Sequence, residues 1–248
     1  MKRFLILLTA LLLVLAALPS CAGKSDAYDL YSGAAEQLSK TTSAAITLTS
    51  KVLDDSGENV LKQTVTEYCI NGDDMSLKLS VEGNTSPSVH YTYLGGMLYS
   101  EIGTAGNEKW KAECARNAIA SATGVSIDMG FITKLPTLEK KDFKDVTVTT
   151  NGTYKKITVK IPQSLLTGWI AGITGAAEVE ASSESIETTL LFDQNGTVNS
   201  VYLRFRISVG TQVIKVDVTV SYADVDAQKP ITLPSSESKY QLITLKQS

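Results

Sequence analysis

The sequence predicts an α+β protein built on one strongly curved antiparallel sheet, an unclosed β-barrel or half-barrel, with helices packed on its concave face. Most of the chain after Ala45 alternates apolar and polar residues with a period of two, which is typical of strands with one wet face. Two segments, 26–40 and 162–173, instead carry apolar residues at helical spacing. Strands as long as 198–209 rarely stay flat, so the twist of such a sheet is expected to curl it.

The N-terminus has the features of a lipoprotein signal peptide. Lys2 and Arg3 precede an apolar run over 4–18, and the run ends in the sequence Leu-Pro-Ser-Cys, with the cysteine at position 21. A basic start, a short apolar stretch and small residues before a cleavage site are typical of secretory signals, and the cysteine indicates lipid modification. The alternative is an uncleaved anchor helix, but the apolar run is too short to span a bilayer comfortably.

This signal defines the expected organisation of the chain. We expect residues 1–20 to be the signal peptide, and residues 21–25 to be the lipidated Cys21 and a short tether. Residues 26–248 then form a single β-rich domain, placed outside the cytoplasm and anchored to the bacterial cell membrane by its N-terminal lipid. No later segment is long and apolar enough to cross a membrane, because Pro162 and several glycines interrupt the best candidate.

Two meanders of strands are predicted, separated by a helical or irregular region over 112–137. The alternating pattern places the strands at 46–52, 60–70, 75–81, 89–94, 97–101, 146–150, 154–161, 184–192, 198–209 and 212–222. The pairs Gly95-Gly96 and Asn151-Gly152 tolerate positive φ and predict tight hairpins.

The two predicted helices differ in character. In the first, Ala27, Tyr31, Ala34 and Leu38 form one apolar stripe, and Ser25 or Asp26 can cap the first turn. The second helix follows Pro162 and is apolar nearly all round, so it must be buried or must cover something apolar. Its apolar residues are Leu165, Leu166, Trp169, Ile170 and Ile173.

The residues offer little support for catalysis, metals, cofactors or nucleic acid. The single histidine, His90, lies in a strand and is expected to be a packed or surface side chain, with no second histidine nearby to share a metal. Neither a nucleophile elbow nor a phosphate-binding loop is present, so we expect a non-catalytic protein without a cofactor. The net charge of −3 comes from interspersed charges, which argues against a nucleic-acid partner.

Two cysteines remain after Cys21. An oxidising compartment permits a disulfide between Cys69 and Cys114, and two separate buried thiols are the alternative. Sequence spacing does not decide between them, because a disulfide requires the two Cα atoms to lie within about 7 Å.

The excess of apolar surface has two interpretations. In one, the helices plug the sheet and form an ordinary core, as in a structural or protein-interaction module of the cell envelope. In the other, the helices and the sheet enclose a cavity for an apolar ligand. Periodicity alone does not distinguish a filled barrel from an empty one.

The order of elements resembles a bacterial group of lipid carriers, the lipoproteins related to LolA and to the mycobacterial carriers LppX and LprG. The resemblance rests on the lipobox, the N-terminal helix before the strands, the mid-chain helical insertion, and the closing meander that ends in Tyr222-Ala223-Asp224 before Lys229-Pro230. It implies an unclosed barrel around helices, with a hydrophobic pocket that carries acyl chains.

Together these observations predict a membrane-anchored lipoprotein that binds a lipid or another hydrophobic ligand without catalysis. The resemblance implies that the second helix faces the pocket, with the long strand 198–209 opposite it. The candidate ligand-binding residues are Leu165, Leu166, Trp169, Ile170, Ile173, Leu203, Phe205 and Ile207.

Overall fold

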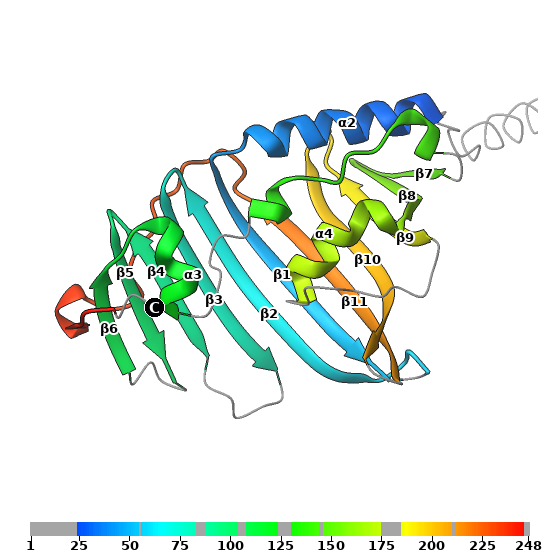
Figure 1. Cartoon of the computed structure of the whole chain (residues 1–248). Coiled ribbons are helices and arrows are strands. Elements are labelled where there is room, and N and C mark those ends of the chain that lie inside the picture. Colours follow the sequence, from blue (N-terminus) through cyan, green and yellow to red (C-terminus); the bar gives the residue numbers. More distant parts are fainter. Residues whose placement is uncertain are drawn as a thin grey trace, which may run out of the picture.

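In the computed structural model the described residues form one large open sheet of 12 strands with few helices. The structure describes residues 24–54, 56–82, 88–103, 108–123, 130–143, 146–174, 185–209 and 212–245. The strand order is β12-β6-β5-β4-β3-β2-β1-β11-β10-β9-β8-β7 (Figure 1). The expected signal peptide and Cys21 lie outside the described residues.

The sheet consists of two antiparallel meanders joined side by side. The first meander contains β1 (Ser43–Leu53), β2 (Val60–Asn71), β3 (Asp74–Glu82), β4 (Val89–Leu94), β5 (Met97–Ile102) and β6 (Glu108–Glu113). The second contains β7 (Val146–Asn151), β8 (Tyr154–Pro162), β9 (Ser185–Phe192), β10 (Val198–Val209) and β11 (Gln212–Ala223). The long antiparallel pairing of β1 with β11 joins them, so the first strand of the domain lies at the centre of the sheet.

The helices and the irregular region complete the chain. The α-helices are α2 (Lys24–Lys40), α3 (Ile119–Thr123) and α4 (Gln163–Thr174). Short 3-10 turns are η1 (Arg116–Ala118), η2 (Gly130–Thr133), η3 (Lys140–Asp142) and η4 (Glu237–Lys239), and the short strand β12 (Gln241–Leu242) pairs in parallel with β6. Both long helices therefore occur within two residues of their predicted limits, and every predicted strand is present.

The alternation of the sequence sorts side chains onto the two sides of the sheet as expected. Ile46 on β1 lies opposite Tyr68 on β2 and Tyr222 on β11, and all three are buried. We call this side the core face and the opposite side the outer face. On β10 the buried Leu203 and Phe205 point to the core face, and the exposed Arg204 between them points to the outer face.

The helix α2 packs on the core face through its predicted stripe. Ala27, Tyr31, Ala34 and Leu38 are each at most 2% exposed, whereas Asp29, Glu36 and Gln37 between them are exposed. The ring of Phe143, just after η3, makes edge contacts with Tyr28 and Tyr31 at centroid distances of 5.6 and 5.5 Å. Aromatic edge contacts of this kind add stability beyond the buried area, so Phe143 holds the irregular region against α2.

Tight turns join the strands where the sequence predicts them. Gly152 follows Asn151 in the β7–β8 turn and has φ of 60°, a left-handed conformation that costs other residues about 1 kcal/mol or more. No other atom lies within 4 Å of the position that a Cβ of Gly152 would occupy, so the backbone alone explains the glycine.

Candidate functional site

The core face presents a continuous apolar row across both meanders. Reading across the paired strands, this row comprises Ile102, Val89, Leu79, Thr66, Leu48, Val220, Val201, Leu190, Ile157 and Val148. A single polar side chain, Thr66, interrupts it. An apolar row of this length must be covered by protein or by a ligand, because exposing it to water costs about 25 cal/mol per Å².

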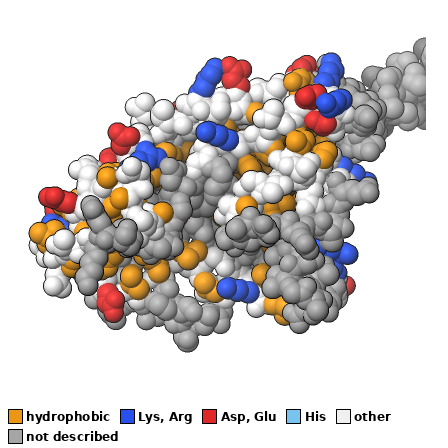
Figure 2. All heavy atoms as spheres, viewed as in Figure 1, with side chains coloured by type: hydrophobic (Ala, Val, Ile, Leu, Met, Phe, Trp, Pro, Cys, Tyr) orange, Lys and Arg blue, Asp and Glu red, His pale blue; other side chains and the backbone are white. Residues whose placement is uncertain are grey.

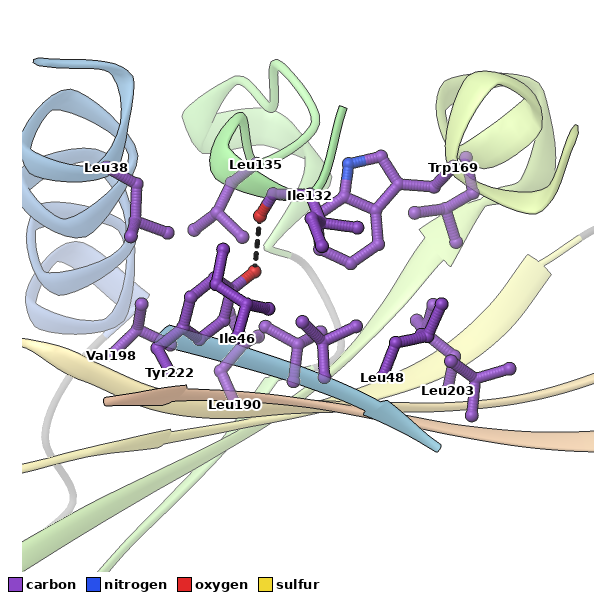
Figure 3. Close-up of a cluster of buried hydrophobic side chains, with 14 of the residues drawn as sticks. Leu38, Ile46, Leu48, Ile132, Leu135, Trp169, Leu190, Val198, Leu203 and Tyr222 are labelled. Atoms are coloured by element: carbon purple, nitrogen blue, oxygen red, sulfur yellow. Dashed lines mark hydrogen bonds between the residues drawn. The ribbon is translucent and has the colours of Figure 1, made fainter. Parts of the chain in front are cut away.

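One stretch of irregular backbone, residues 130–138, lies over this face and is held by three side chains from separate elements. We call it the anchor segment. Tyr222 on β11 donates its hydroxyl to the carbonyl oxygen of Ile132 at 2.7 Å (Figure 3). Trp169 on α4 donates its indole N–H to the Lys134 oxygen at 2.8 Å, and Tyr31 on α2 donates to the Pro136 oxygen at 2.6 Å.

These three bonds satisfy alternate carbonyl groups of the same segment. Buried carbonyl oxygens need partners, and these three lie within or just after the short 3-10 turn η2, where side chains supply the donors. Burial raises the pKa of both Tyr31 and Tyr222 well above the ordinary value, so both hydroxyls keep their protons and remain donors. The anchor segment thereby links α2, α4 and the central strand β11 on one side of the sheet (Figure 3).

The predicted ligand-binding residues of α4 mostly face the interior. Leu166, Trp169 and Ile170 are 1%, 5% and 0% exposed, and Ile173 is half-buried against the core. Leu165 is 40% exposed and does not line the interior. The helix α4 therefore covers the apolar interior with one face only, and Ser164, Leu165, Thr167 and Gly168 form its exposed face.

Of the predicted residues of β10, two are buried and the side chain of the third is not described. Leu203 and Phe205 are 0% and 3% exposed and belong to the same buried cluster as Trp169. Ile207 pairs with Ile214 in the β10–β11 ladder, and its side chain lies outside the described residues. The structure therefore brings five of the predicted side chains into one cluster with Ile173 packed against it: Leu166, Trp169, Ile170, Leu203 and Phe205.

Packing on the core face is tight at one end of the strands and looser at the other. At one end of β3 and β5, Met75 and Leu98 are fully buried and belong to the core cluster. Farther along the same strands, Leu79, Val89 and Ile102 lie side by side and are only half-buried. Figure 2 shows hydrophobic side chains reaching the surface of this side of the molecule among mostly uncharged atoms.

Both cysteines of the domain are free thiols. Cys69 lies on the outer face of β2, and Cys114 directly follows β6. Each is half-buried, and burial raises the pKa of both thiols, so both are protonated at neutral pH.

His90 has a partner that the sequence did not indicate. Its Nε2 lies 2.8 Å from the hydroxyl oxygen of Ser76 on the neighbouring strand. Burial lowers the pKa of His90 despite the opposing effect of Glu101, so the imidazole is neutral near pH 7. The contact with Ser76 joins the side chains of β3 and β4 on the outer face.

The outer face carries a second feature that sequence reasoning missed. Residues 224–245, which we call the C-terminal strap, cross from β11 to β6. The N–H of Gln228 bonds Ser43 Oγ at 2.9 Å, Lys111 pairs with Glu237 at 2.6 Å, and the ring of Tyr240 packs on Tyr99 at 5.2 Å. A cavity of about 280 Å³ lies beneath the strap, lined by Ala45, Cys69, Ser76, Asp224, Lys229 and Ile231, among others.

Within the described ranges, no three His, Cys, Asp or Glu residues lie close enough together to hold a metal ion. In the same part of the chain, no helix has the length and apolar character needed to cross a membrane.

Comparison with known proteins adds no family or relative to these observations. No protein-family model matches the chain, and no curated protein matches its sequence.

Proposed function

We propose that this protein is a membrane-anchored extracytoplasmic lipoprotein that binds a lipid or another hydrophobic ligand without catalysis. The ligand would lie on the concave core face of a curved, unclosed half-barrel, against the half-buried side chains of Leu79, Val89 and Ile102. The resemblance to the LolA and LppX–LprG carriers suggests the same use of such a fold.

The proposal rests on the difference in burial between the side chains at the two ends of the core face. At the end held by the anchor segment, side chains are fully buried, as in any protein core. At the other end, Leu79, Val89 and Ile102 form a half-buried apolar row, which ends at the exposed Glu108 on β6. Acyl chains are suited to cover such a row, because each buried methylene group contributes about 0.8 kcal/mol.

The anchor supports the same function. A lipid on Cys21 and the short tether that follows would keep the domain at the surface of the bilayer, where an acyl-chain ligand is available. Replacing Cys21 with Ser in the full chain should release the protein from the membrane fraction, since no acyl chain can then be attached. A Ser20→Thr variant is the matched control and should stay in the membrane fraction.

A binding titration with a core-face variant tests the proposal. Residues 22–248 should bind a neutral diacylglycerol or an environment-sensitive fatty-acid dye. A Leu79→Gln variant should bind about tenfold more weakly, because an amide without a partner in an apolar site costs about 1–3 kcal/mol. Lys78→Gln lies on the outer face of the same strand and should bind as the unmodified protein does. Equal affinities for all three proteins, or no binding by any, would overturn the proposal.

A structural or interaction module with a filled core is the second candidate. The tight packing of the second meander favours it, since Ile157, Val159, Phe192 and Leu203 are each 0% exposed. In that case the half-buried end would contact a protein partner. Leu79→Gln would then leave dye binding unchanged and weaken a pull-down of envelope proteins.

A further inference from the structure

The two edges of the sheet differ in charge and in cover. At one edge, β6 carries Glu108, Lys109, Lys111 and Glu113, and the short strand β12 pairs with it. Charges and a covering segment protect an edge strand, because its unpaired backbone groups can otherwise recruit another strand. At the other edge, β7 pairs with β8, and no further strand of the described part of the chain pairs with it.

The sequence of β7 gives its edge no such protection. Residues 146–151 read Val-Thr-Val-Thr-Thr-Asn, without a charge, a proline or a glycine, and all but the last are β-branched. Thr147 and Thr149 are exposed on the outer face. Val146 and Val148 pack against the core cluster but are only half-buried. A neighbouring strand could therefore cover surface on both faces of β7.

The β7–β8 hairpin determines which backbone groups point into the open edge. Asn151 pairs with Tyr154 across a two-residue turn, so these two residues exchange both hydrogen bonds. Every second residue along β7 bonds β8 in the same way, because hydrogen-bonded and non-hydrogen-bonded pairs alternate in an antiparallel ladder. The N–H and C=O groups of Val146, Val148 and Thr150 therefore point away from β8, where an added strand could bond them.

A second copy of β7 matches these groups. In the antiparallel register centred on Val148, this residue lies opposite its own copy, and Val146 lies opposite Thr150 of the second copy. All the backbone groups that point outward then have partners. On the outer face, Thr147 lies opposite Thr149 of the second copy, and threonine pairs of this kind stabilise adjacent strands. No like charges oppose each other in this register.

The position of α2 favours a second copy over a strand of another protein. A two-fold axis perpendicular to the sheet relates the two β7 strands, so both core faces lie on the same side. The helix α2 contacts β7, and Tyr28 near its start packs on Phe143, which precedes β7 (Figure 1). Both α2 helices therefore begin on the same side of the joined sheets, as the proposed anchoring of two chains in one membrane requires.

We propose that β7 is a dimerisation edge, through which two copies of this chain join their sheets by antiparallel pairing centred on Val148. The core faces of the two sheets then form one continuous surface. The pairing uses the backbone and the side chains of β7 alone, so it does not depend on which ligand the core face binds.

A charge exchange at the two exposed threonines tests the pairing. Thr147→Lys/Thr149→Lys places lysine opposite lysine in the dimer, whereas Thr147→Lys/Thr149→Glu places lysine opposite glutamate. Both variants change the same exposed residues, so each is the matched control for the folding of the other. Sedimentation equilibrium of residues 22–248 should show a concentration-dependent dimer of the unmodified protein. The dissociation constant of the first variant should be about tenfold higher than that of the second.

Hydrogen exchange identifies the strand that pairs. The amides of Val146, Val148 and Thr150 should exchange slowly at concentrations where the dimer forms and rapidly on dilution. A monomer at every concentration, or equal dissociation constants for the two variants, would overturn the proposal. Slow exchange of these three amides in a monomer would mean that the chain covers its own edge. A monomer that binds another envelope protein through β7 would assign the edge to that protein, and either result would also overturn the proposal.

Discussion

The hydroxyl of Tyr222 is expected to stabilise the fold by holding the anchor segment to the centre of the sheet. Tyr222→Phe removes one oxygen atom and keeps the ring, which packs among buried residues and is itself only 7% exposed. The carbonyl of Ile132 then loses the donor that lies 2.7 Å away. Leaving a buried acceptor without a partner costs about 1–3 kcal/mol.

For a domain of this size, a loss of about 1.5 kcal/mol lowers Tm by about 3–6 °C. Thermal unfolding of residues 22–248, followed by circular dichroism, measures this shift. Tyr154→Phe is the matched control, because Tyr154 is 47% exposed and its variant should unfold within about 1 °C of the unmodified protein. The reasoning is refuted if Tyr222→Phe unfolds at the same temperature as Tyr154→Phe.

Three further predictions concern the β1–β2 turn and the thiols. Gly57→Ala should lower the free energy of unfolding, measured in urea, by about 1–2 kcal/mol, because φ of Gly57 is 80° and the new Cβ would crowd Lys215. An unchanged urea midpoint would contradict this prediction. Hydrogen bonds to the Asp54 carboxylate, of which the one from Ser56 has the largest effect, hold the pKa of Asp54 well below its usual range. The ionised carboxylate therefore stabilises the folded protein at neutral pH, and this stabilisation is lost in acid. The Tm difference between the unmodified protein and Asp54→Ala should therefore narrow below about pH 4, and a difference that stays constant down to about pH 2 would argue against it. Because Cys69 and Cys114 are free, dithiothreitol should leave Tm unchanged, and a Tm that falls on reduction would show that they are bonded.

Periodicity predicted most of the fold because burying one face of a strand requires apolar residues at every second position of the sequence. The run from Val201 to Phe205 shows this, with every second side chain buried. Strand β6 was not predicted, since only Trp110 and Ala112 mark its core face and charged residues occupy the remaining positions. The tertiary structure supplies the reason for those charges, because Lys109 and Lys111 pair with Glu101 and Glu237.

The features that define the site were harder to predict. Tyr31, Trp169 and Tyr222 donate hydrogen bonds to backbone carbonyl oxygens of the anchor segment. Every residue has such an oxygen, so no residue type in the sequence identifies the acceptors. Leu165 was assigned to the interior because composition alone does not fix the rotation of a short apolar helix.

Native mass spectrometry of residues 22–248, purified from bacterial cells without detergent, tests the central claim most directly. The claim is that the half-buried end of the core face, at Leu79, Val89 and Ile102, accommodates a hydrophobic ligand. We predict a second species heavier than the protein by the mass of a lipid, which disappears when the protein is unfolded and which is depleted in Leu79→Gln. A single species at the mass of the bare protein, together with no uptake of an added phosphatidic acid or diacylglycerol, would contradict the account.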